Sequence, residues 1–208
     1  AEDGTTVVSR PRVMPPIDRQ ATFSGTKDVA DALAFDAARL EAYLAARLPD
    51  FAGPLAVRQF KGGQSNPTYL LETPGRRYVL RRKPPGKLLP SAHAVDREFR
   101  VIAALSKQGF PVAKAYALCT DDSVIGSTFY IMSMEEGRVF WDPTLPSQTP
   151  DARRKIFTSK IETLAKLHTY DPQAIGLGDF GKPGNYFARQ VDRWTKQYRA
   201  SETQYIEE

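Results

Sequence analysis

The spacing of apolar residues changes abruptly after Pro49, and this change limits the folds that the chain can adopt. Between Asp36 and Pro49, apolar residues recur at intervals of three and four, which predicts a helix that Asp36 caps and Pro49 ends. Three short segments then alternate with period two and predict strands at 55–60, 67–73 and 77–82. A helix followed at once by three strands indicates an antiparallel sheet that a helix covers.

The later segments extend this pattern and then end it. Residues 93–107 predict a second helix, and two further strand candidates follow at 113–119 and 127–134. Further along, helical spacing returns, with Thr149 as the expected cap of one helix and Asn185 as the expected cap of another. The second and third strands are joined by TPGR, in which Pro before Gly predicts a type II turn.

These elements predict an α+β fold in three parts. Residues 1–26 are polar and rich in proline, which indicates a flexible N-terminal arm. Residues 27–136 form a lobe with a five-stranded, mainly antiparallel sheet plus a helix, and residues 137–208 begin a helical lobe. Val191, Trp194 and neighbouring apolar residues form a stripe on the last helix, which we expect to pack against other helices.

Composition excludes several classes of protein. With 208 residues, 41% hydrophobic and 25% charged, the chain has the makeup of a soluble globular protein with a core of its own. No apolar run approaches the roughly 20 residues that span a bilayer, and no secretory signal pattern opens the sequence. Cys119 is the single cysteine, so an intramolecular disulfide and a cysteine metal site are excluded. We therefore expect a cytoplasmic protein without a membrane partner.

Positive charge is concentrated in one short segment. The net charge is +5, and residues 76–87 carry six cations and no acid. A nucleic-acid groove would interleave aromatic residues with these cations, and only Tyr78 does so. The segment therefore indicates a solvated face or a site for a phosphorylated small molecule, and we expect no nucleic-acid partner.

The stretch FKGGQSNPTYLL, residues 60–71, connects the first two predicted strands and allows two interpretations. Gly and Asn tolerate positive φ, so the stretch could be an ordinary hairpin turn. It could also be a loop that binds phosphate through its backbone. The residues concerned are Gly62, Gly63, Gln64, Ser65 and Asn66.

Five motifs, taken in order, resemble the aminoglycoside phosphotransferase family, whose fold is that of protein kinases. They are FKGGQSNPTYLL, RYVLRR, DREFRVIAAL, FYIMSMEEG and IETLAKLH. The resemblance covers residues 28–206, and within the family it is greatest to the kinase-like domains joined to, or encoded beside, acyl-CoA dehydrogenases. It implies an ATP-dependent transfer of phosphate to a hydroxyl group of a small molecule.

The resemblance assigns the five polar and glycine residues of the stretch to the nucleotide phosphates. Glycines without a Cβ let the backbone approach phosphate oxygens closely, and Ser65 and Asn66 could add side-chain donors. The stretch is not the GxGxxG loop of protein kinases. It is not a P-loop either, because no Gly-Lys-Ser/Thr ending and helix follow it.

The resemblance also implies a charge pair and an adenine site. Arg81 takes the place of the strand cation that grips the α- and β-phosphates, and Glu98 takes that of its helix partner. Arginine in place of lysine keeps the charge and adds bidentate geometry. The Ser133 C=O and the Glu135 N–H would pair with adenine, which Met132 would border. Arg81 and Glu98 could instead be ordinary surface charges. The predicted adenine site could instead be a core strand that ends in a turn.

Two apparent metal motifs do not carry over. Asp179 opens a DFG triplet, but no H-R-D or H-G-D loop precedes it, and it lies in a Gly-rich link between helices. His168 ends a predicted helix, where its charge is favoured, and a structural role is expected. We therefore expect no metal ligand in this sequence.

The sequence also contains no catalytic base pattern, so we expect no catalytic residue in this chain. The family supplies the base and the Mg²⁺ ligands from H-G-D, an asparagine and a later aspartate, and none of this pattern occurs before Glu208. Two interpretations remain: the front part of a longer phosphotransferase, or a non-catalytic nucleotide-binding or interaction module. For the first, we expect ATP and Mg²⁺ as cofactors. The expected acceptor is a hydroxyacyl-CoA rather than an aminoglycoside, with a functional link to an acyl-CoA dehydrogenase.

Overall fold

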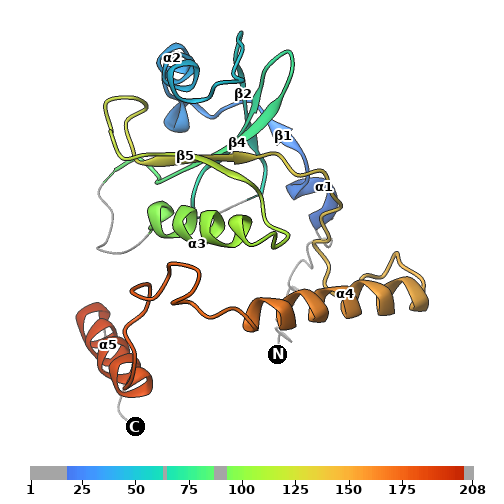
Figure 1. Ribbon diagram of the computed structural model, residues 1–208, viewed down its shortest axis with the longest axis vertical. Helices are drawn as coiled ribbons and strands as arrows, with labels where there is room; N and C mark the ends of the chain where they lie inside the picture. Colours follow the sequence, from blue (N-terminus) through green and yellow to red (C-terminus); the bar gives the residue numbers. More distant parts are fainter. Residues whose placement is uncertain (1–17, 63–64, 87–92, 204–208) are drawn as a thin grey trace, which may run out of the picture.

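The computed structural model describes residues 18–62, 65–86 and 93–203 of the chain (Figure 1). A sheet of six strands forms its centre, in the order β1-β2-β3-β4-β6-β5, and every neighbouring pair is antiparallel. The strands are β1 Thr26–Lys27, β2 Ala56–Phe60, β3 Thr68–Glu72, β4 Arg77–Arg82, β5 Ala115–Cys119 and β6 Phe129–Ser133. The five strands predicted from the sequence are confirmed.

The sixth strand corrects the predicted count. β1 pairs with the edge of β2, with Thr26 opposite Phe60, and it lies at the end of the segment expected to be an arm. The same segment contains a short helix, α1 Arg19–Phe23, which Asp18 caps by accepting a hydrogen bond from the Ala21 N–H at 3.1 Å. A two-residue strand and a five-residue helix are too short to show a period, so the sequence does not announce them.

Helix α2, Ala37–Arg47, covers one face of the sheet (Figure 1). The Asp36 carboxylate accepts a hydrogen bond from the Arg39 N–H at 3.0 Å, as the predicted cap requires. Leu40 and Leu44, one turn apart, are fully buried against the strands. On β3, β4 and β6 the residues in this core alternate with period two, and β5 adds Cys119; the alternating residues are Tyr69, Leu71, Tyr78, Leu80, Phe129 and Ile131.

Helix α3, Val95–Lys107, lies on the opposite face, next to β5 and β6 (Figure 1). Because successive side chains of a strand point to opposite faces, Val79 and Arg81 are on the α3 side while Leu80 points to the α2 core. Gly109 follows the helix at φ 65°, a left-handed conformation that glycine adopts without strain and that ends the helix.

The turn between β3 and β4 differs from the predicted type. The Thr73 N–H donates to the Arg76 carbonyl at 3.0 Å, so the chain does turn here. Gly75, however, does not have the positive φ that the third position of a type II turn requires. The type II prediction is therefore wrong.

Two helices follow the sheet, α4 Pro150–His168 and α5 Tyr186–Ser201, on the α3 side of the molecule (Figure 1). Thr149 caps α4 through a bond from the Ala152 N–H at 3.2 Å, as predicted. Asn185 stands at the cap position of α5, but it adopts φ 48° and its side chain makes no cap bond, which corrects the prediction. Among the described helices, none has the length and apolar character needed to cross a membrane.

The apolar stripes of α4 and α5 are open to solvent. On α5, Trp194 is 60% and Phe187 is 81% exposed, and Ile161 on α4 is 59% exposed. The expected packing of the α5 stripe against other helices is therefore not found among the residues that the structure describes.

Candidate functional site

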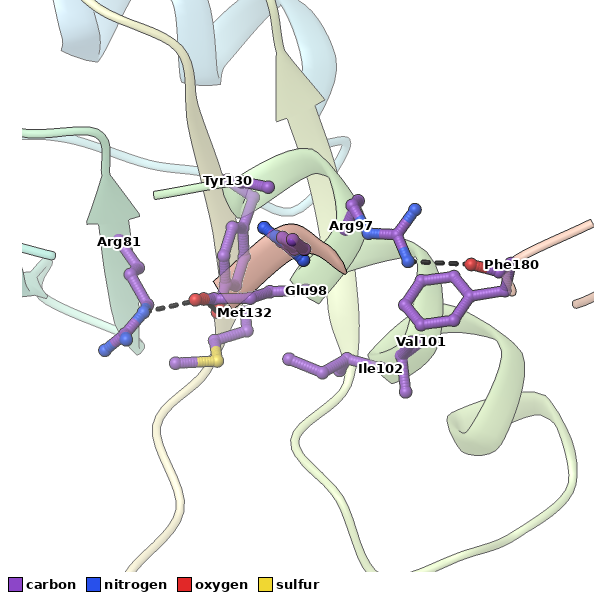
Figure 2. A pocket seen from close by; sticks show the side chains of 10 residues that line it. Arg81, Arg97, Glu98, Val101, Ile102, Tyr130, Met132 and Phe180 are labelled. Atoms are coloured by element: carbon purple, nitrogen blue, oxygen red, sulfur yellow. Dashed lines mark hydrogen bonds and ion pairs between the residues drawn. The ribbon is translucent and has the colours of Figure 1, made fainter. Parts of the chain in front are cut away.

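Two cavities lie on the α3 side of the sheet and share Arg81 and Met132 in their walls. The larger has a volume of about 1270 Å³ and extends from the sheet across the loop at Gly62 to the linker at residues 133–137. The smaller has a volume of about 860 Å³ and lies between β4, α3 and Phe180 (Figure 2). Arg81 therefore lies where the two cavities meet.

The predicted pair of Arg81 and Glu98 is present. The Arg81 Nε donates to Glu98 Oε2 at 2.7 Å, and its Nη1 donates to the Thr68 hydroxyl at 3.2 Å. The two charged side chains are 29% and 35% exposed, so water screens them less than it screens a surface pair. The Arg81 Nη2 makes no hydrogen bond to a described residue, which leaves it able to meet an anion in the cavity.

Tyr130 is a third member of this group. It lies on β6 directly opposite Arg81, and its hydroxyl donates to Glu98 Oε2 at 3.1 Å (Figure 2). Burial raises the pKa of Tyr130, and the negative charge of Glu98 raises it further. The phenol therefore stays protonated at neutral pH and acts as a donor that orients the carboxylate.

The loop residues divide into four groups. Gly62 lines the larger cavity, Ser65 is exposed, and Gly63 and Gln64 lie outside the described residues. Asn66 was expected to donate to a phosphate. Instead it is 3% exposed and lines neither cavity, because both ends of its amide have protein partners. The structure thus gives Asn66 a different contact from the expected one.

The linker residues border the larger cavity as expected. Met132 lies in its wall, and the Ser133 hydroxyl accepts from the Lys114 N–H at 2.8 Å and donates to the Glu135 carboxylate. The Glu135 N–H makes no hydrogen bond to any residue in the described part of the chain. It is therefore able to pair with a ligand, as the adenine prediction requires.

A wall of the larger cavity comes from residues that the sequence did not point to. The Phe23 ring at the end of α1 lies 5.2 Å from the Trp141 ring, and the Gln20 Nε2 donates to the Val139 carbonyl at 2.9 Å. Gly62 packs directly against this pair. The N-terminal segment and the region after the linker thus close the cavity together.

The Asp179–Phe180 segment is attached to α3 rather than directed at a metal. The Arg100 Nη1 donates to Asp179 Oδ2 at 3.1 Å, and the Arg97 Nη2 donates to the Phe180 carbonyl at 2.7 Å (Figure 2). The hydrogen bond from Arg100 lowers the pKa of the Asp179 carboxyl. Among the residues that the structure describes, no three His, Cys, Asp or Glu side chains converge as metal ligands.

The family described as the phosphotransferase enzyme family, APH, matches residues 56–208, about three quarters of the sequence. The chain belongs to this family. A crystal structure from Ralstonia eutropha JMP134, described as a "putative aminoglycoside phosphotransferase", is 54% identical to it and superposes with a TM-score of 0.70. That match covers 83% of this chain and 50% of the other, and it confirms the α+β, protein-kinase-like fold.

Two relatives of this APH-family chain have names that mention acyl-CoA dehydrogenases. "Probable acyl-CoA dehydrogenase IBR3" of Arabidopsis thaliana is 55% identical over 150 residues, which are 70% of this chain and 18% of that protein. "Acyl-CoA dehydrogenase family member 11" of Homo sapiens is 45% identical over 190 residues, which are 88% of this chain and 24% of that protein. The chain thus spans less than a quarter of these relatives, and the predicted likeness to dehydrogenase-associated domains is confirmed.

Several contributors to the site of this APH-family chain were missed in the sequence, among them Tyr130, His93 and Trp141. Tyr130 could have been found, because period two puts it on the same strand face as Met132 and opposite Arg81 in register. His93 and Trp141 gave no comparable signal. His93 reaches the site through a contact with Asn66, 27 residues away, and Trp141 reaches it through contacts with α1.

Proposed function

We propose that this chain is the nucleotide-binding part of an ATP-dependent phosphotransferase that phosphorylates a hydroxyl group of a small molecule. The observation that carries the proposal is the Arg81–Glu98 pair, which lies where the two cavities meet. The wall of the larger cavity there includes Gly62, the first residue of the glycine loop (residues 62–66), and the linker (residues 133–137). A cation held by a glutamate beneath a glycine loop is the arrangement that grips nucleotide phosphates in kinase-type sites.

Each wall of the larger cavity suits one part of ATP. Phe60, Val79 and Met132 offer apolar contacts for a planar base, and the Glu135 N–H can donate to it. Gly62 allows the backbone to approach the phosphates, and the Arg81 Nη2 supplies positive charge beside them. Glu98 and Thr68 hold that guanidinium in place, so little order must be gained when the nucleotide binds.

The residues that the structure describes offer no self-contained Mg²⁺ site, because no three His, Cys, Asp or Glu side chains converge among them. In a kinase-type site this ion is held by one or two carboxylates together with the nucleotide phosphates. The one carboxylate of the DFG-like segment is held by Arg100. We therefore derive no step through Mg²⁺ from this chain.

For the acceptor we propose a hydroxyacyl-CoA rather than an aminoglycoside, together with a functional link to an acyl-CoA dehydrogenase. The support is indirect: two relatives bear acyl-CoA dehydrogenase names, whereas the solved neighbour bears an aminoglycoside phosphotransferase name. The acceptor can be identified from initial rates of ADP release by the full-length protein. The compounds to compare are a hydroxyacyl-CoA, its dehydroxylated analogue and an aminoglycoside. Turnover with the aminoglycoside alone would contradict the proposal.

The phosphate grip can be tested with Arg81→Ala in the full-length protein. We expect kcat/KM for ATP to fall. The loss should correspond to about 3 kcal/mol of transition-state stabilisation, the scale of removing one charge-stabilising donor. Arg76→Ala is the matched control, because it removes the same charge from the same cationic segment but lies at the β3–β4 turn. Unchanged kcat/KM in Arg81→Ala would refute the assignment.

A non-catalytic nucleotide-binding or interaction module is the second candidate, in which the exposed apolar stripes of α4 and α5 would meet a partner. For residues 1–208 alone, we expect no Mg²⁺-dependent ATP turnover, since no catalytic-loop pattern is present. We also expect poor solubility, because the apolar stripes of α4 and α5 are exposed. Turnover by the purified segment would contradict this expectation, and full-length protein that binds ATP without turnover would favour the second candidate.

A further inference from the structure

Asn66 connects the glycine loop to the start of α3 through both ends of its side-chain amide. The Asn66 Nδ2 donates to Glu98 Oε1 at 3.0 Å, and the Asn66 Oδ1 lies 2.7 Å from the His93 Nδ1. The amide is 3% exposed, so water does not replace either partner. Glu98 Oε2 thus accepts hydrogen bonds from Arg81 and Tyr130, and Glu98 Oε1 accepts one from Asn66.

The partners fix the direction of every hydrogen bond in this group. An ionised Glu98 can only accept, so the amide must present its NH₂ to the carboxylate and its oxygen to His93. The His93 Nδ1 must therefore carry a proton and donate it to Asn66. The series runs from His93 through Asn66 to Glu98, and the carboxylate in turn accepts from Arg81.

Two members of the series, His93 and Asn66, are also constrained at the backbone. His93 adopts φ 58°, a conformation that costs a non-glycine residue free energy, and it stands two residues before the first residue of α3. The Asn66 carbonyl accepts from the Thr68 hydroxyl at 3.1 Å, and that hydroxyl accepts from Arg81. The loop end, β4 and α3 are thus joined in one hydrogen-bonded group.

We propose that Asn66 and His93 are positioning residues that hold Glu98, and through it Arg81, in the orientation that grips the nucleotide phosphates. The inference rests on the proposed function, since it names how the phosphate grip is kept in place. Neither residue lines either of the two cavities described above, so both act through Glu98 and not by contact with a ligand there.

The test exploits the position of the donor in His93. Asparagine carries an N–H at the place of Nδ1, two bonds from Cβ, whereas glutamine carries its N–H one bond further out. In the full-length protein, His93→Gln should weaken ATP binding by about three- to tenfold, the effect of one neutral hydrogen bond. His93→Asn should restore it to within about twofold of the unaltered protein, because the donor is retained.

Asn66→Asp should have the larger effect, because it places a second carboxylate beside Glu98. We expect ATP affinity to fall by about ten- to a hundredfold, the range for a lost hydrogen bond to a charged group. Adenosine affinity should change by less than about twofold in all these variants, since adenosine has no phosphate to grip. The matched control is His168→Gln, the same change at the other histidine, which is exposed at the end of α4.

Calorimetric affinities for ATP and adenosine, with urea unfolding of each variant, distinguish the outcomes. Equal affinities of His93→Asn and His93→Gln for ATP would overturn the inference, as would parallel losses for ATP and adenosine. Nitrogen-15 spectra of the histidine rings give an independent check, in which a His93 protonated only at Nε2 would also overturn it. If the unaltered protein binds no ATP, the proposed function fails too; if it binds ATP and no variant differs from it, the inference alone fails.

Discussion

Replacing Gly62 with alanine tests how tightly the glycine loop is packed. A Cβ at this position would lie 2.9 Å from Cζ2 and 3.0 Å from Cη2 of Trp141, and 3.2 Å from the Phe23 carbonyl oxygen. The first of these distances is shorter than real Cβ contacts, so the ring or the loop must shift. The ring cannot move freely, because it is packed against Phe23 at the end of α1.

Two opposing effects set the size of the change. Overpacking of this kind lowers the free energy of unfolding by about 1–3 kcal/mol. Alanine in place of glycine restricts the unfolded chain and so raises the free energy of unfolding by about 0.4–1 kcal/mol. This gain applies because Gly62 does not have a positive φ, which alanine would resist. We therefore expect Gly62→Ala to lower the free energy of unfolding by about 1–2 kcal/mol, measured by urea denaturation.

Two further variants make this measurement decisive. Gly75→Ala is the control: no atom lies within 4 Å of its added Cβ, so it should be neutral or stabilising by up to about 1 kcal/mol. Trp141→Phe removes the two ring carbons that the methyl group would meet, so Gly62→Ala should cost about 1 kcal/mol less in that background. An equal cost in both backgrounds would refute the packing argument.

The same position tests the phosphate loop. Gly62→Val adds bulk against Trp141, so the loop must shift from the position in which its backbone would approach phosphate. ATP affinity in the full-length protein should therefore fall more than adenosine affinity. Gly63→Val should do the same, although Gly63 lies outside the described residues. Equal losses for both ligands would indicate a general disturbance of the sheet.

Two other arginines give predictions about structure. Arg82 is buried and donates to the carbonyls of Leu33 and Ile125 at 3.1 and 3.0 Å, so Arg82→Met should lower the free energy of unfolding by about 2 kcal/mol; unchanged urea stability would contradict this. Arg100→Met should raise the lowered pKa of Asp179 toward its ordinary range, seen by NMR titration. Because that pKa is lowered on folding, its contribution to stability is present above the ordinary carboxyl pKa and is lost as pH falls. An Asp179 pKa that is the same in Arg100→Met as in the unaltered protein would contradict the assigned cause.

The sequence by itself determined most of the helices and strands. Strand period two put Arg81 on the face opposite Leu80, and helical spacing put Glu98 beside the buried stripe of α3, while the pairing of the two came from the family resemblance. Asp36 and Thr149 were predictable caps because a cap bonds to a backbone group only three residues away. The predictions of elements and caps succeeded because each depends on neighbours within one or two turns of the chain.

Only the tertiary structure decided what surrounds that pair. The wall formed by α1 and Trp141 depends on the Gln20 to Val139 bond, which joins residues 119 positions apart. The diversion of Asn66 from the cavity to Glu98 depends on a contact across 32 positions. An amide has the same donors and acceptors wherever it lies, and neither composition nor period records which partner is near. The packing of the loop against α3 therefore determines whether such a side chain meets a ligand or another part of the protein.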